Sequence, residues 1–303
     1  MSNKAPLALC LVVSVSMLGC SSAGRTPPMP AAPSPVPSAF VWPAPSGQFV
    51  LGYRTTSPTS RLLTNSGEVF LPQQANCRVV NNTWGISTNS IPGNGTGRSA
   101  IFEELVNGVP AIGWAWDVKK IQVGPVVYPE IGWGWSPWLM DWHNGPVPTW
   151  RISDHKRYAA DFNIRRTDRS GMWNTDFDIW LFPVPNPKGG PERFKPGIEL
   201  MIFLDQNNFG PWKQEISIAR GPAGRDWTAW KSNQSADWTL IGYLNNGEPI
   251  DDARGFDLTA FFDDAVDRYD IPADDYIIDI EFGSEVYDGH GMLELANYRV
   301  GSQ

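Results

Sequence analysis

Two carboxylates, Glu199 and Asp205, lie an even number of positions apart in a segment that has the pattern of a β-strand, residues 197–205. Because side chains in a strand point alternately to its two faces, one face would carry Glu199, Met201, Phe203 and Asp205. The residues between them are all aliphatic, as expected for a face that packs on a core. A carboxylate beside Met and Phe would be half-buried, and desolvation and neighbouring charges would shift its pKa. Such a position suits a carboxyl that takes part in chemistry.

Two further segments show the same alternation. In residues 174–182 one face would carry Asn174, Asp176, Asp178 and Trp180. In residues 276–287 one face would carry Asp279, Glu281, Gly283 and Glu285. Three strands would therefore present carboxylates on one sheet surface. The alternation leaves a second interpretation open, in which these are ordinary solvent faces, because the solvent faces of antiparallel strands are polar by default.

Local sequence favours the first interpretation. Residues 199–204 (Glu-Leu-Met-Ile-Phe-Leu) and 282–285 (Phe-Gly-Ser-Glu) resemble the two signature strands of glycoside hydrolase family 12, which contains endoglucanases and xyloglucan hydrolases. Further matches follow in the same order at residues 81–85 (Asn-Asn-Thr-Trp-Gly), 127–129 (Val-Tyr-Pro) and 174–179 (Asn-Thr-Asp-Phe-Asp-Ile). The resemblance covers roughly residues 76–300.

This resemblance implies an all-β fold, a concanavalin-like jelly-roll β-sandwich with an open cleft for a polysaccharide and one short helix on its outer face. It also implies that Glu199 is the nucleophile, that Glu285 is the acid/base, and that Asp178 assists beside the nucleophile. Two carboxyls about 5 to 5.5 Å apart permit a covalent glycosyl-enzyme and retention of stereochemistry, and we expect this narrow separation.

The resemblance further assigns substrate contacts. Trp84 matches a cleft tryptophan that stacks on a sugar ring, although packing in the core is the alternative, and Asn82 matches a neighbouring hydrogen-bonding amide. We assign four more positions to substrate binding: Tyr128, Asn174, Met201 and Phe203.

Three positions depart from the family pattern. Phe203 stands where Trp is usual, Val286 where Pro commonly follows the acid/base, and Glu281 where Gln is common. An extra carboxylate at Glu281 is expected to shift the pH optimum.

Composition agrees with a neutral polymer as the partner. The net charge of −8 argues against binding to nucleic acid or to an anionic membrane surface, since an acidic protein gains nothing from counterion release. Fifteen tryptophans exceed the needs of a core of this size, and such rings often stack on flat ligands. We expect no cofactor and no catalytic metal, because His143, His155 and His290 lack ligand spacing. The protein is expected to act as a monomer.

The N-terminal residues predict export. Residues 1–20 have the pattern of a lipoprotein-type signal, in which Cys20 becomes the lipidated N-terminus. Residues 21–46 are rich in Pro, Ala and Ser and predict a linker, so that residues 47–303 would form one catalytic domain. Ser21 resembles the residue after the cysteine in lipoproteins sorted to the outer membrane of Gram-negative cells; a Gram-positive host would give an extracellular anchor instead. Cys77 would then have no disulfide partner.

Two other segments carry expectations. Residues 257–268 predict the one helix, with Asp257 as its N-cap. Residues 132–142, which are rich in tryptophan, would either line the cleft or pack on the sandwich as a hydrophobic loop.

The leading hypothesis from the sequence is an endo-acting hydrolase of β-1,4-glucan, whether cellulosic, mixed-linkage or xyloglucan. A surface glycan-binding lipoprotein without activity is one alternative, and the retention of all three catalytic-type carboxyls argues against it. The other alternative is a xylanase with a similar jelly-roll fold. The amino-acid sequences of the two Glu motifs favour the glucanase over the xylanase.

Overall fold

The computed structural model describes residues 40–64, 69–70, 77–87, 93–143, 147–187, 197–210, 215–218, 220–233 and 238–302. The predicted signal with Cys20, and the predicted linker up to residue 39, lie outside these residues. Phe40 and Trp42 pack against Val106, Ala111 and Ala296. The packed part of the chain therefore includes Phe40, seven residues before the predicted boundary at residue 47.

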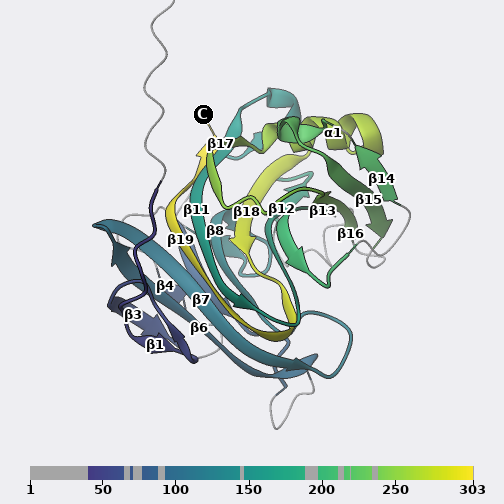
Figure 1. The fold of residues 1–303 in the computed structure, drawn as a ribbon. Helices are drawn as coiled ribbons and strands as arrows, with labels where there is room; N and C mark the ends of the chain where they lie inside the picture. The colour runs from purple at the N-terminus through teal and green to yellow at the C-terminus, as the bar shows by residue number, and fades with distance from the viewer. Residues whose placement is uncertain are drawn as a thin grey trace, which may run out of the picture. The chain divides into compact units, whose positions relative to one another are not determined.

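Two β-sheets account for most of the described chain (Figure 1). The larger sheet has, in spatial order, β4 (Val69–Phe70), β5 (Arg78–Asn82), β8 (Tyr128–Ser136), β18 (Tyr276–Gly283), β12 (Met172–Phe182), β13 (Gly197–Asn207), β16 (Trp238–Asn245), β15 (Trp227–Asn233) and β14 (Glu215–Ile218). The smaller sheet has β3 (Thr59–Leu63), β6 (Gly95–Val106), β7 (Val109–Lys120), β19 (Val286–Ser302), β11 (Tyr158–Arg169) and β17 (Asp252–Asp257).

Short elements complete the described fold. They are β1 (Phe49–Val50), β2 (Tyr53–Arg54), β9 (Asp141–Trp142), β10 (Trp150–Arg151), two 3-10 turns at Ile152–Asp154 and Pro222–Gly224, and α1 (Thr259–Tyr269). The strand pairs are antiparallel except β13 with β16, which run parallel. The start of β19 also pairs with the start of β12 and so joins the two sheets.

The core lies between the two sheets and is rich in aromatic rings. Phe162 of β11 in the smaller sheet lies 6.0 Å from Phe177 of β12 and 6.1 Å from Phe282 of β18, measured between ring centroids. Ile179 and Leu200 on neighbouring strands of the larger sheet are fully buried in the same cluster. Removal of these apolar faces from water is the main force that holds the sheets together.

The aliphatic residues predicted to face the core do so, and this fixes the other face of the larger sheet. Cross-strand pairing places Trp180 of β12 between Glu199 of β13 and Asp279 of β18. One row further along, Asp178 lies between Met201 and Glu281. The carboxylates predicted to share a sheet surface therefore do share one, which we call the carboxylate face.

The helix differs from its prediction at its N-terminus. It starts at Thr259 and ends at Tyr269, and Leu258 occupies the capping position without a side-chain hydrogen bond. Asp257, the predicted N-cap, instead accepts a hydrogen bond from the backbone N–H of Thr259 at 3.1 Å. Phe261 packs edge-on against Trp227 of β15, so that the helix covers this end of the larger sheet (Figure 1).

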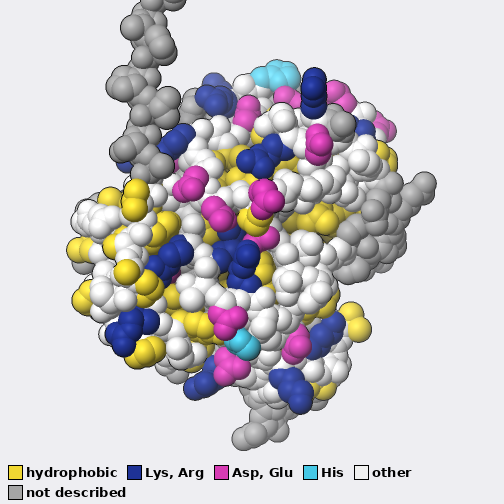
Figure 2. Space-filling view, in the orientation of Figure 1, with side chains coloured by type: hydrophobic (Ala, Val, Ile, Leu, Met, Phe, Trp, Pro, Cys, Tyr) yellow, Lys and Arg dark blue, Asp and Glu magenta, His cyan; other side chains and the backbone are white. Residues whose placement is uncertain are grey.

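The face seen in Figure 2 is charged but mixed in sign. Figure 2 shows Lys and Arg side chains interspersed with Asp and Glu side chains over the visible face, without a basic patch. In the described part of the chain, no helix has the length and apolar character needed to cross a membrane.

Candidate active site

A cleft of about 660 Å³ opens on the carboxylate face. Its walls come from β5, β8, β12, β13, β16 and β18 and from the turns after β5 and β8. Seven of the predicted site residues line it: Asn82, Trp84, Tyr128, Asp178, Glu199, Met201 and Glu285. The cleft thus brings together positions that lie more than 200 residues apart in the sequence.

Glu199 is the third residue of β13, with Trp180 and Leu240 as its cross-strand neighbours. The indole N–H of Trp238 donates a hydrogen bond of 2.7 Å to its Oε2. Burial and then the charge of Glu285 raise the pKa of Glu199 to about 8, although the bond from Trp238 acts in the opposite direction.

Glu285 lies in the short break between β18, which ends at Gly283, and β19, which begins at Val286. Asn174 holds it from both sides: Nδ2 donates to Oε2 of Glu285 at 2.9 Å, and Oδ1 accepts from the Glu285 backbone N–H at 3.2 Å. The hydroxyl of Tyr287 donates to the same Oε2 at 3.3 Å. Burial raises the pKa of Glu285, and these two donors moderate the rise.

The two carboxyls can share one proton at neutral pH, since the charge on one opposes ionisation of the other. Their hydrogen-bond partners are unequal. An indole N–H can only donate, so Trp238 stabilises Glu199 as a carboxylate. The hydroxyl of Tyr287 can also turn to accept a proton from Glu285. The side-chain N–H of Asn174 on Glu285 can likewise only donate, so these contacts allow the shared proton on Glu285 without fixing it there.

Asp178 lies on β12, between Met201 of β13 and Glu281 of β18. Its pKa is raised well above the usual range by burial and by the charges of Glu199 and Glu281. Within the described residues, Oδ1 of Asp178 is buried without a hydrogen-bond partner. A protonated Asp178 can donate a hydrogen bond to the nucleophile or to a bound sugar.

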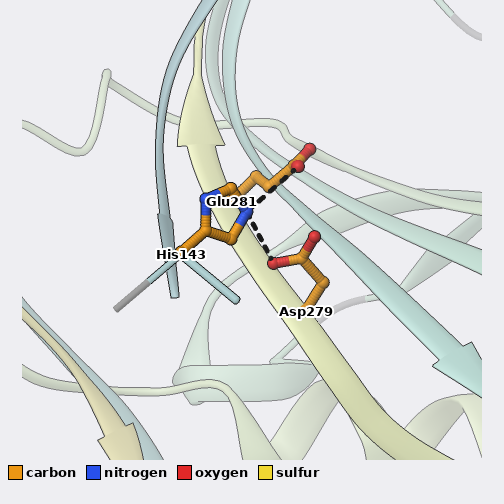
Figure 3. Close-up of side chains that lie close together, drawn as sticks. All are labelled: His143, Asp279 and Glu281. Carbon is orange, nitrogen blue, oxygen red and sulfur yellow. Dashed lines mark ion pairs between the residues drawn. The ribbon is translucent and has the colours of Figure 1, made fainter. Parts of the chain in front are cut away.

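A buried cluster of His143, Asp279 and Glu281 lies beside the catalytic-type carboxyls (Figure 3). Nε2 of His143 is 3.2 Å from Oδ1 of Asp279 and 3.6 Å from Oε1 of Glu281. The spacing of the histidines did not predict this cluster, because His143 reaches β18 only through the turn after β8 and the short strand β9, which it directly follows. The alternation on β18 did place both carboxylates on this face.

Aromatic rings form the rest of the cleft. Trp84 is 60% exposed, so the alternative that it packs in the core is wrong. Trp138 is 46% exposed and meets Trp180 and Trp238 edge-on, with ring centroids 5.1 and 6.0 Å apart. Trp133, in the same tryptophan-rich segment, is buried in the core. The two interpretations of residues 132–142 thus apply to different parts of that segment.

Two predicted substrate contacts do not line the cleft. Asn174 is fully buried, and its side chain is used in holding Glu285. Phe203 is fully buried and stacks on Trp230 with ring centroids 5.6 Å apart. Both residues therefore support the cleft without lining it: Asn174 holds Glu285, and Phe203 packs against Trp230.

Residues 130–301 match the family model described as Glycosyl hydrolase family 12, and this span is more than half of the chain. The chain belongs to glycosyl hydrolase family 12. Endoglucanase S from Pectobacterium parmentieri is 25% identical over 230 residues, which are 73% of this chain and 79% of that protein.

Solved family 12 structures share the fold. The family 12 xyloglucanase from Bacillus licheniformis superposes with a TM-score of 0.67 at 21% identity, over 80% of this chain and 100% of that one. Endoglucanase cel12A from Rhodothermus marinus gives a TM-score of 0.63 at 24% identity, over 80% and 99% of the two chains. The expected all-β jelly-roll sandwich is thereby confirmed.

The three positions that depart from the family 12 pattern can be located in the structure. Glu281, where the family commonly has Gln, is the carboxylate that contacts His143. Phe203, where the family usually has Trp, is covered by Trp230 from β15. Val286 is buried in the core and starts β19.

Proposed function

We propose that this protein is a retaining endo-β-1,4-glucanase in which Glu199 is the nucleophile and Glu285 the acid/base. The observation that carries the proposal is the pair itself: two buried carboxyls line one cleft, Glu199 held by Trp238 and Glu285 held by Asn174 and Tyr287. Membership of family 12 supports hydrolysis of β-1,4-glucan. The protein is an endo-β-1,4-glucan hydrolase.

The chemistry follows from these two positions. Glu285 gives its proton to the glycosidic oxygen as the bond to the leaving chain breaks, and an oxygen of Glu199 bonds to the anomeric carbon. Glu285, now a carboxylate, then takes a proton from water, whose oxygen displaces Glu199. Each step inverts the anomeric carbon, so the product keeps the configuration of the substrate.

Internal cleavage is supported by the open aromatic surface of the cleft. Trp84 and Trp138 expose their rings, which can stack on the flat apolar faces of glucose units. The net charge of −8 and the mixed signs on the face seen in Figure 2 give no electrostatic reason for an anionic polymer. We infer a neutral glucan chain of several units as substrate and a monomer as the acting form.

The test measures reducing ends released from xyloglucan, mixed-linkage β-glucan, carboxymethyl cellulose and xylan by the purified protein and by Glu199→Ala. Release from a glucan that disappears in the variant supports the proposal and names the polymer. Release from xylan alone would indicate a xylanase. No release from any polymer, with binding retained, would indicate a glycan-binding protein without activity.

We further propose that Cys20 is lipidated and anchors the domain to the outer membrane. Support comes from the sequence of residues 1–20 and from the Pro-rich stretch that follows, which would hold the catalytic domain away from the membrane. Cells grown with an alkyne fatty acid should label the protein but not Cys20→Ala. An unlabelled protein released into the medium would contradict the anchor.

A further inference from the structure

His143 occupies a place that the sheet leaves open for it. An added Cβ at Gly132 of β8 would lie 2.3 Å from the His143 ring, so only glycine allows the imidazole to lie on the carboxylate face. The backbone N–H of His143 donates to the carbonyl of Gly134 at 2.9 Å, which ties the residue to the same strand. The ring is fully buried.

The charges around this ring are strongly unbalanced. Asp279 and Glu281 of β18 contact Nε2 and are almost fully buried (Figure 3). Glu130 of β8 and Asp178 of β12, the cross-strand neighbours of Gly283 and Glu281, add two more buried carboxyls.

A cation lies on the strand next to β8. Arg78 of β5 is the cross-strand neighbour of Gly132. Its guanidinium pairs with Asp141 at 3.2 Å, and that carboxylate precedes His143 by two residues. Arg78 is already paired with Asp141. The positive charge that compensates the buried carboxylates of β18 therefore has to come from His143.

We propose that His143 is a charge-compensating positioning residue, whose contacts with Asp279 and Glu281 offset their negative charge and thereby set the pH at which Glu199 becomes a working nucleophile. This role rests on the proposed function of Glu199. It concerns a residue that touches neither substrate nor the reacting atoms.

The link to Glu199 is electrostatic. Glu281 lies in the row next to Glu199 on the carboxylate face, and its charge is one of the causes that raise the pKa of Glu199. A proton on His143 cancels part of that charge. Burial opposes a charge on the imidazole, but the contacts with Asp279 and Glu281 outweigh it and raise the pKa of His143 to about 9. The proton therefore stays in place throughout the neutral range.

A proton fits this cluster better than a metal ion. Histidines that bind metals almost always donate their second ring N–H to an orienting acceptor. In the described part of the chain, Nδ1 of His143 is buried and has no such partner. A protonated ring also leaves its Nδ1–H without a partner, and the charges of the two carboxylates close to Nε2 offset that cost.

The test compares pH profiles of kcat/KM on the preferred glucan for the wild type, His143→Gln, Glu281→Gln and the double variant. His290→Gln is the matched control, since His290 pairs with Asp168 on the surface and is about half exposed. Loss of the His143 proton should shift the acid limb of the profile by about 1 unit to higher pH. Glu281→Gln should shift it to lower pH, and the double variant should return close to the wild type. The control should match the wild type.

A structural role alone would lower the rate of His143→Gln at every pH without moving the limb, and that result would overturn the proposal. Nuclear magnetic resonance of the His143 ring in the wild type provides a second measurement that needs no activity. A ring that stays protonated to about pH 9 supports the proposal, while titration near the usual 6.5 overturns it. Activity that resists dialysis against a chelator supports the proton; activity lost to the chelator and restored by a metal overturns it. If no glucan is hydrolysed, the ring titration still separates failure of this proposal from failure of the proposed function.

Discussion

Trp238 donates its indole N–H to Oε2 of Glu199 at 2.7 Å, so the nucleophile is held by a residue 39 positions away in the sequence. The parallel pairing of β13 with β16 makes this possible, because it places Trp238 beside Gly197, two residues before Glu199. A donor of this kind stabilises the carboxylate form without competing for its proton. The same ring also supports Trp138 at the cleft rim.

Trp238→Phe should lower kcat/KM about 10- to 100-fold, because a hydrogen bond to a charged group contributes about 1.5 to 3 kcal/mol. Without that donor the pKa of Glu199 should rise, and the acid limb should move to higher pH. Steady-state kinetics across pH check both effects. Trp138→Phe is the control for the acid limb, because it keeps an aromatic edge against Trp180 and leaves the hydrogen bond from Trp238 to Glu199 in place. An unchanged acid limb in Trp238→Phe would contradict this role.

Asn174→Ala should lower kcat by about tenfold or more with little change in KM, because Glu285 would lose both of its contacts with the Asn174 side chain and keep only the one from Tyr287. The lost donor should also raise the pKa of Glu285 further, so the alkaline limb of the profile should move to higher pH. Asn208→Ala, whose side chain bonds to the carbonyl of Gly171, is the control. Equal losses in the two variants would argue against a specific effect on Glu285.

Trp84→Ala should raise KM about tenfold on polymeric glucan and change kcat less, because an exposed stacking platform contributes to binding of the sugar in both the ground state and the transition state. Initial-rate kinetics on soluble glucan check the split. A loss confined to kcat would mean that Trp84 acts on the reacting sugar instead of holding the chain.

Stability should fall as pH rises from about 4.5 to 8. Burial and contact with Glu294 raise the pKa of Glu104 to about 8, and burial with the charge of Asp279 raises that of Glu281 to about 7. A carboxyl whose pKa is raised by folding contributes stability below its unfolded pKa and loses it as pH passes the folded value. Thermal unfolding should therefore give a higher Tm at pH 5 than at pH 8.

Glu104→Gln offers a matched test away from the cleft, since it mimics the protonated carboxyl. It should raise Tm at pH 8 by about 2 °C or more and change it little at pH 5. Activity should not change. A Tm that falls equally at both pH values would contradict the linkage.

The strands and the face that bears the chemistry could be predicted because their signal is local. Alternation of period two fixes which side of β13 carries Glu199 whatever the rest of the fold does. The alternation was less reliable at Glu285, since β18 ends at Gly283 and the backbone of Asn174 takes over the pairing there. The helix start was off by two residues because Asp257 bonds to Thr259 from one position before the cap.

The parts of the site that could not be predicted depend on tertiary contacts. Trp238 reaches Glu199 through a parallel strand pair, and no spacing in the sequence encodes that register. His143 reaches Asp279 only because a turn folds back over Gly132. Phe203 could be placed on the correct face but not beneath Trp230, since that ring comes from another strand.

The most direct test of the central claim is to trap the covalent intermediate. The purified protein is incubated with a 2-deoxy-2-fluoro cello-oligosaccharide that carries an activated leaving group, digested, and analysed by mass spectrometry. The account predicts one added sugar on the peptide that contains Glu199, and none in Glu199→Ala. Hydrolysis of glucan with inversion at the anomeric carbon, or a label on another carboxyl, would contradict it.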